Sequence, residues 1–390
     1  MKKLVSILLC TVMLFALAAC GERKLPEEPP SAPIGTEKTA EAPTEAPTEE
    51  PTPEPTATPT ATPTPEPTAA PTPEPTEDPR PCITCDLEAP DSLPEEAVFT
   101  VLFRGRYGDG EDEFGCDSYG ETDGPNDYFF ADGKLAILDT MHKLVKVFDG
   151  EQLVRTIDVS DVQYPFSMEL FGGSLYVYNT FMLHYICEYD WETGDYIRTF
   201  RPPEGVEATG NDSALYEKDG RLCIKTGMGK FRNVLDPDDP EIREVEVESV
   251  WSPENDEPDY PDCHVFTTEF GAVTIDHGIG GTSSFEGLDD EGNAYFLAGP
   301  WVDGTPYITY EFTLRKYSPE GKLIGIAGMS YKFVDHSLTR ELRITGDGRI
   351  FLMKCMEGEL TLTEIELGRV YYMRTDEIRE WRNNYYQEHN

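Results

Sequence analysis

Short apolar runs separated by glycine turns fill the chain from about residue 95 onward. The clearest lies at residues 130–149, where two apolar segments flank Asp139 and Thr140. Apolar residues that alternate with polar ones over about four to eight positions are typical of half-buried β-strands. A helical period occurs only near the C-terminus, where Ile378, Trp381 and Tyr385 share one face. We therefore predict an all-β domain over residues 95–375, followed by a C-terminal helix or tail over residues 376–390.

The turns recur at intervals that suggest a repeated unit. They contain Gly133, Gly173, Gly220, Gly292 and Gly348, with spacings of 40, 47, 72 and 56 residues. The spacing of 72 contains an acidic insertion at 236–262 and an apolar run at 270–275, which we assign to a degenerate unit. One strand precedes each turn and three follow it in the regular units. Six four-stranded antiparallel sheets of about 40–50 residues, repeated radially, predict a β-propeller.

One apolar strand, at residues 98–103, precedes the first unit and belongs to no unit of its own. We predict that it pairs with the last blade, built from residues 338–373, and closes the ring. Closure removes exposed sheet edges, which otherwise seed aggregation.

The segment Gly-Asp-Gly-Glu-Asp-Glu-Phe at 108–114, followed by the run at 132–149, resembles the NHL-type six-bladed propeller repeat. His142 stands at the asparagine position of that repeat, and Lys143 or Leu144 near its arginine. The resemblance covers residues 108–148, and later units share only the glycine turn. It implies a six-bladed ring. It implies no single activity, because propellers of this kind include scaffolds, receptors and enzymes.

The N-terminus reads as an export signal. Lys2 and Lys3 precede an apolar run at residues 4–19, which is shorter than the roughly 20 residues of a spanning helix. The run ends in Leu17-Ala-Ala-Cys20, which resembles the lipobox of bacterial lipoproteins. That resemblance implies removal of residues 1–19 and a lipidated N-terminus at 20–24, with acyl chains such as palmitate attached through Cys20. An ordinary secretory signal with a coincidental cysteine is the alternative.

Residues 25–94 are predicted to form a disordered tether rich in Pro, Thr and Glu. Proline removes hydrogen-bond donors, glutamates repel one another, and little apolar surface is available for burial. Such a segment forms an extended spacer. We expect it to hold the domain away from the extracytoplasmic face of a bacterial membrane, at a Gram-positive cell surface. Near its end, Cys82 and Cys85 form a CxxC pair, for which a structural disulfide is favoured over a redox or metal site.

The formal charge of −42 argues against nucleic acid as a partner, since like charges repel. Apart from membrane lipid at Cys20, the expected partner is an extracellular protein, peptide or glycan. No common catalytic motif is found, and Cys263-His264 lacks companion ligands at zinc spacing. No cofactor or metal is therefore assigned. Calcium at Asp289-Asp-Glu-Gly-Asn293 stays an alternative to a plain strand turn, although the loop lacks an EF-hand glutamate.

Ligand binding is expected at the loops that link the second and third strands of each blade and at the connections between blades. The longest such loop carries Trp301, Asp303 and Tyr307, which offer flat apolar surface and a carboxylate. Further candidates on the same face are His142, His184, Tyr164 and His277. Packing between blades is the alternative role for these side chains. The predicted function is a tethered binding scaffold, and the alternative is a propeller enzyme, a metal-assisted lyase or hydrolase.

Overall fold

The computed structural model describes residues 81–116, 124–180, 184–203, 214–250, 261, 263–277, 281–303, 309–329, 341–356 and 358–380. The chain divides into two units, Met1–Glu74 and Pro75–Asn390, and the described residues all belong to the second. Cys20 and the tether up to residue 80 lie outside them. Within the described part, no helix has the length and apolarity needed to cross a bilayer.

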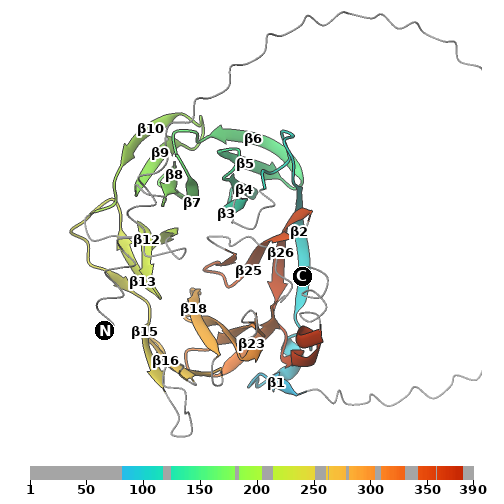
Figure 1. The fold of residues 1–390 in the computed structure, drawn as a ribbon. Coiled ribbons are helices and arrows are strands. Elements are labelled where there is room, and N and C mark those ends of the chain that lie inside the picture. Colours follow the sequence, from blue (N-terminus) through green and yellow to red (C-terminus); the bar gives the residue numbers. More distant parts are fainter. Residues whose placement is uncertain are drawn as a thin grey trace, which may run out of the picture. The chain divides into compact units, whose positions relative to one another are not determined.

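The second unit is a six-bladed β-propeller, in which six sheets stand around a central axis (Figure 1). The first blade contains β3 (Pro125–Ala131), β4 (Lys134–Asp139), β5 (Leu144–Asp149) and β6 (Gln152–Asp158). The second contains β7 (Pro165–Phe171), β8 (Ser174–Asn179), β9 (Tyr185–Asp190) and β10 (Tyr196–Phe200). The third contains β11 (Leu215–Lys218), β12 (Arg221–Gly227), β13 (Lys230–Asn233) and β14 (Ile242–Arg243).

The fourth sheet contains β15 (Glu246–Val250), β16 (Cys263–Thr268) and β17 (Gly271–Asp276). The fifth blade contains β18 (Thr282–Leu288), β19 (Ala294–Gly299), β22 (Thr313–Tyr317) and β23 (Leu323–Gly328), with the small hairpin β20 (Trp301–Asp303) and β21 (Thr309–Tyr310) inserted between β19 and β22. The sixth contains β24 (Leu342–Ile344), β25 (Ile350–Met356), β26 (Glu359–Glu366) and β2 (Val98–Arg106). The predicted all-β ring is confirmed.

The glycine turns connect the first and second strands of each regular blade, as predicted. In the first blade Asp132 and Gly133 both have positive φ, at 51° and 74°, and Asp219 and Gly220 repeat this at 50° and 68°. Two successive positive φ angles define the type I′ turn, whose twist matches that of antiparallel strands. Local turn chemistry therefore fixes the start of these hairpins.

The predicted closure is also confirmed. Strand β2 pairs antiparallel with β26, from Val98 opposite Glu366 to Arg106 opposite Glu359, and forms the outer edge of the sixth blade. Phe103 from β2 is buried and packs against Phe114 and Phe148, at ring-centroid distances of 6.2 and 4.7 Å. One strand from the N-terminal side thus completes the last blade and contributes to the core that joins it to the first.

The fourth sheet departs from the regular pattern. It has three strands among the described residues, whereas the other five blades have four. Apolar clusters join blades one and two, two and three, four and five, five and six, and six and one. Between the third and fourth, the partly buried Met228 of the third blade packs against the cluster that joins the fourth and fifth. The fourth sheet packs on the fifth blade, where the ring centroids of Phe266 and Phe296 lie 4.7 Å apart.

Residues 81–94 are not part of a disordered tether, and this part of the predicted linker is wrong. Strand β1 (Cys82–Thr84) pairs with β27 (Val370–Tyr372), and a short 3-10 helix, η2 (Pro90–Ser92), follows. The Cys85 and Asp86 amides donate to the carbonyls of Arg369 and Leu323. The segment at 81–94 thus makes a second contact between the two ends of the propeller. Its Pro-rich composition gives no indication of this contact.

The expected Cys82–Cys85 disulfide is not formed. Cys82 and Cys85 are both free thiols, with Cys82 exposed on β1 and Cys85 buried. The Cys85 thiol lies 3.8 Å from the Gly368 carbonyl, under the β1–β27 pair. The two side chains have different surroundings because the strand carries one outward and the other into the core.

The chain is helical from residue 375 to 380, which agrees with the start of the predicted C-terminal helix. Ile378 is buried, and Trp381 and Tyr385 lie outside the described residues. The helix start is held by Glu311, a buried carboxylate that accepts hydrogen bonds from the Arg374 amide, from Thr375, and from the Tyr371 hydroxyl at 2.8 Å. A carboxylate at a helix N-terminus also interacts favourably with the helix dipole.

Candidate functional site: the central channel

A cavity of about 410 Å³ lies where the inner strands face one another. Its walls come from β3, β7, β11, β18 and β24, together with β12 and β13, and none of the described residues of the fourth sheet contributes to them. A second space of about 350 Å³ shares Tyr216, Lys225, Phe285, Glu286 and Leu342 with the first. We call these two spaces together the central channel.

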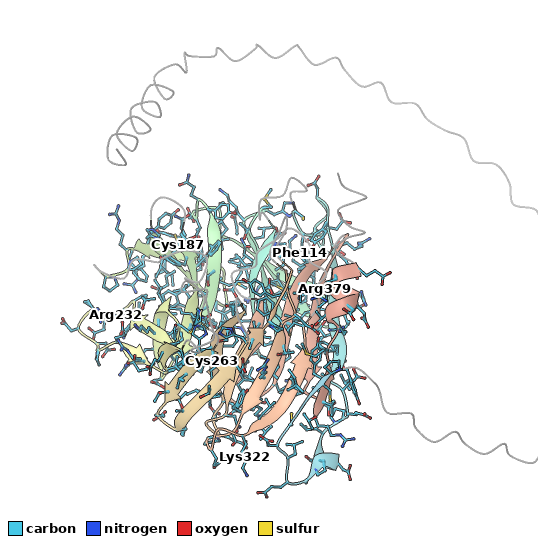
Figure 2. The ribbon with its side chains drawn as sticks, turned by 60° about the horizontal axis from the view of Figure 1, so that its bottom comes forward. Phe114, Cys187, Arg232, Cys263, Lys322 and Arg379 are labelled. Atoms are coloured by element: carbon cyan, nitrogen blue, oxygen red, sulfur yellow. The ribbon has the colours of Figure 1, made fainter. Side chains whose placement is uncertain are left out.

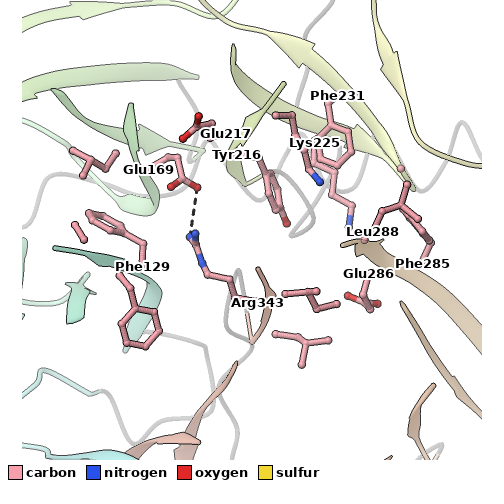
Figure 3. Close-up of a pocket in the computed structure, with 18 of the residues that line it drawn as sticks. Phe129, Glu169, Tyr216, Glu217, Lys225, Phe231, Phe285, Glu286, Leu288 and Arg343 are labelled. Atoms are coloured by element: carbon pink, nitrogen blue, oxygen red, sulfur yellow. Dashed lines mark hydrogen bonds and ion pairs between the residues drawn. The ribbon is translucent and has the colours of Figure 1, made fainter. Parts of the chain in front are cut away.

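An ion pair crosses the channel (Figure 3). Arg343 on β24 lies 3.4 Å from the Glu169 carboxylate on β7 and 4.0 Å from that of Asp127 on β3. Glu169 and Asp127 are buried, and the buried Nε of Arg343 has no partner within the described structure. The guanidinium also lies over the Tyr128 ring, 5.8 Å from its centroid. One side chain therefore balances two carboxylates of two other blades.

The inner strands are also linked by hydrogen bonds between blades. The Ser167 hydroxyl donates to Asp127 at 2.7 Å, and the Leu215 amide donates to the Ser167 hydroxyl at 2.9 Å. Asp127 and Ser167 both follow a strand irregularity next to a proline, at Pro125 and Pro165. This repeated bulge turns the polar side chains toward the next blade and fixes the channel wall.

The remaining wall mixes aromatic and charged groups. Figure 3 shows Tyr216 and Lys225 of the third blade and Arg343 of the sixth directed into the channel. Glu286 lies opposite and accepts a hydrogen bond from Ser284 at 2.5 Å. Ligand pockets typically combine apolar walls with a few positioned polar groups. The arrangement can therefore hold a ligand that carries both positive and negative groups.

Glu341 lines the Glu286 end of the channel, and Lys354 lies close enough to Glu341 to affect its pKa. Glu341 is exposed as a residue, but the protein around its carboxyl group raises the pKa of that group through burial. The negative charge of Glu286 raises this pKa further, and the positive charge of Lys354 lowers it. Burial likewise lowers the pKa of Lys354, against the effect of Glu341. Burial thus shifts each group toward its neutral form.

The described residues among those predicted for ligand binding lie on the face opposite the glycine turns, but most are held within their own sheets. His142 bonds Asp139 at 2.8 Å, the His184 ring lies 3.1 Å from the Tyr178 hydroxyl, and the Tyr164 amide donates to Asn179. His277 is buried against His264. Trp301 and Asp303 lie on β20, with side chains outside the described set, and Tyr307 is outside it altogether. None of the described candidates lines the channel.

Lys146 is a structural residue that the sequence did not reveal. Its amine is buried, lies 2.9 Å from the buried Asp139 carboxylate and donates to the Glu113 carbonyl. Asp139 in turn accepts from the Gly115 amide, so the loop at 108–115 is fastened to the first blade.

The channel residues were also missed by the sequence analysis. Glu169, Glu217, Glu286 and Arg343 all precede a glycine turn, on the first strand of a blade. A charged residue in that strand was the available signal. This signal is not specific, because alternating charge is also typical of a strand face open to solvent.

The turn considered for calcium has another role. The Asp289 carboxylate accepts hydrogen bonds from the side-chain and backbone amides of Asn293, from Tyr295 and from Lys316. These donors occupy the lone pairs that a cation needs. The described residues contain no group of three or more His, Cys, Asp or Glu side chains suited to one metal ion.

No protein-family model matches the sequence, and no curated protein matches it. Among solved structures, glutaminyl cyclase from Myxococcus xanthus is 13% identical with a TM-score of 0.32, covering 70% of this chain and 99% of that chain. BamB from Moraxella catarrhalis is 11% identical with a TM-score of 0.28, covering 61% and 71%. A chain of the mitotic checkpoint complex is 14% identical with a TM-score of 0.32, covering 59% and 70%. These scores are too low to support any argument about function.

Proposed function

We propose that this chain is a lipid-anchored bacterial surface protein whose propeller binds an extracellular protein, peptide or glycan in its central channel. The observation that carries the binding role is the cluster of Arg343, Glu169, Lys225 and Glu286 beside Tyr216 in a cavity of about 410 Å³. The wall offers both charge signs and aromatic faces at one place. These are the groups that orient polar ligands of mixed charge.

The anchor rests on the Leu17-Ala-Ala-Cys20 segment and on the Pro-rich stretch that follows it. A diacyl anchor buries many methylene groups at about 0.8 kcal/mol each, which is enough for stable attachment. The test is the Cys20→Ser variant, expressed in a bacterium that processes lipoproteins. The variant is expected in the soluble fraction and the wild type in the membrane fraction. Equal membrane fractionation of both would contradict the anchor.

Binding is tested by thermal shift of the detergent-solubilised full chain with two probe sets, short synthetic peptides of mixed charge and cell-wall glycan fragments. A probe of one set is expected to raise the melting temperature. The shift should disappear in Lys225→Met and Glu286→Gln and persist in Arg104→Gln, whose side chain pairs with Glu359 on the outer edge of the ring. A shift that survives both channel variants would place binding elsewhere and refute the channel as the site.

The alternative of a metal-assisted enzyme using channel histidines has less support. The described residues that line the channel include carboxylates, lysines and Arg343, but no histidine. The described wall therefore favours ligand binding over such chemistry.

A further inference from the structure

Two histidines and a serine converge between the fourth sheet and the fifth blade. His264 Nδ1 on β16 lies 3.1 Å from His277 Nε2, just after β17, and 2.7 Å from Ser283 Oγ on β18. His277 and Ser283 are buried, and His264 is partly buried. The strand that contains His264 begins at Cys263, which is labelled in Figure 2. The cluster is thus built from three separate segments of the chain.

Hydrogen bonding alone does not satisfy this arrangement well. A neutral imidazole nitrogen either carries one hydrogen or offers one lone pair. His264 Nδ1 faces both His277 Nε2 and Ser283 Oγ. In either tautomer it can make a well-aligned hydrogen bond with only one of them at a time. A cation between the two rings would use the lone pairs of both nitrogens at once.

The distance between the rings also fits a shared metal ion. Zinc binds imidazole nitrogen at about 2.0–2.1 Å, so two such nitrogens on one tetrahedral ion lie about 3.3 Å apart. The observed separation is 3.1 Å. Metal-bound imidazoles must be neutral.

We propose that His264 and His277 form a binding site for a divalent late transition metal ion such as Zn²⁺, with Ser283 beside the bound ion. Imidazole nitrogen suits zinc, copper and nickel, whereas magnesium and calcium prefer oxygen. Two protein nitrogens leave coordination positions for water, and Ser283 Oγ is placed to contact a water bound there. The site joins the fourth sheet to the fifth blade and does not include the channel residues of the proposed function.

The test uses the full chain in detergent, stripped of metal with a chelator and then equilibrated with Zn²⁺ alone. Bound zinc is measured by mass spectrometry after dialysis. About one zinc per wild-type chain is expected, and the apparent Kd should rise more than tenfold in His264→Ala and in His277→Ala. His142→Ala and Cys263→Ser are matched controls that should keep wild-type affinity. Equal zinc binding by the wild type and both histidine variants, or none by the wild type, would overturn the proposal.

A second measurement remains decisive if a histidine variant fails to fold. X-ray absorption of the wild-type chain loaded with one equivalent of Zn²⁺ should show imidazole scattering from two rings. Thiolate ligation without imidazole would overturn the proposal, because it would assign the ion to the free cysteines. Mg²⁺ at the same concentration should not displace the zinc.

Discussion

Arg343 and Glu169 lie 174 residues apart in the sequence, and their side chains meet at 3.4 Å across the centre of the ring. The pair connects the last blade with the second, and Asp127 adds a contact to the first. Since Arg343 is the cation shared by two buried carboxylates, its loss would leave both of them without a compensating charge. The pair is therefore relevant to stability as well as to the shape of the channel.

Replacing Arg343 with Ala should lower the free energy of unfolding by about 3 kcal/mol, because breaking a largely buried ion pair leaves uncompensated charge. Urea denaturation followed by fluorescence measures the change. Arg349→Ala is the matched control, because Arg349 pairs with Glu364 at 2.8 Å on the exposed surface. Exposed pairs contribute about 1 kcal/mol or less. Equal effects of the two substitutions would contradict a stabilising role for the crossing pair.

The closure of the ring predicts a sharp contrast between two phenylalanines on β2. Phe103 is 3% exposed in the core between the sixth and first blades, whereas Phe99 is 44% exposed. Phe103→Ala should cost about 3–5 kcal/mol through lost burial and a residual cavity. Phe99→Ala should change stability by about 0.5 kcal/mol or less. Urea midpoints of the two variants measure this, and similar midpoints would argue against β2 as the closing strand.

Much of this fold could be predicted because its signals are local. Type I′ turns need residues that tolerate positive φ, and the Asp-Gly pairs at 132–133 and 219–220 indicate such turns in the sequence. The unpaired strand before the first unit was equally informative, since a ring needs each blade to be complete. These features depend on a few neighbouring residues or on simple counting.

The features that were missed depend on distant parts of the chain. Pairing of β1 with β27 joins Cys82 to Tyr372, and nothing in a Pro-rich segment indicates such a partner. The spacing of glycine turns also does not show that the fourth sheet has three strands among the described residues. The channel site combines residues from several blades, each of which resembles an ordinary solvent-facing strand residue in isolation.

The ordered segment at 81–94 predicts unequal reactivity of its two cysteines. Burial, with a smaller contribution from Asp86, raises the pKa of Cys85 to about 11, whereas Cys82 is exposed. At pH 8 a thiol with that pKa is about one-thousandth thiolate, the form that reacts. Iodoacetamide should label Cys82 first and Cys85 only after unfolding, as measured by peptide mass spectrometry. Equal labelling rates would contradict the predicted difference in reactivity. Labelling of either cysteine only after reduction would show that its thiol is not free.

Asp289 predicts a dependence of stability on acid pH. Burial alone would raise its pKa, but hydrogen bonds from Asn293, Lys316 and Tyr295 outweigh this and hold the pKa below its usual range. A carboxyl whose pKa is lower in the folded state stabilises the fold above its unfolded pKa of about 3.9. That contribution is lost as the pH falls through the folded pKa. The fifth blade should therefore weaken in the range below about pH 4.

The Asp289→Asn variant tests this directly. At pH 7 it should be less stable than the wild type by about 2 kcal/mol, because the charge-assisted hydrogen bond to Lys316 is lost. The new side-chain amide also places its N–H groups against the surrounding hydrogen-bond donors. As the pH falls below about 4, the protonated wild-type carboxyl loses the same bond, so the difference between wild type and variant should shrink. Urea denaturation at pH 7, 5, 4 and 3 measures this difference. Asp347→Asn, in the exposed turn of the sixth blade, should show a smaller effect at every pH because water screens its interactions. A difference for Asp289→Asn that stays constant from pH 7 to 3 would mean that the carboxylate charge does not stabilise the fifth blade.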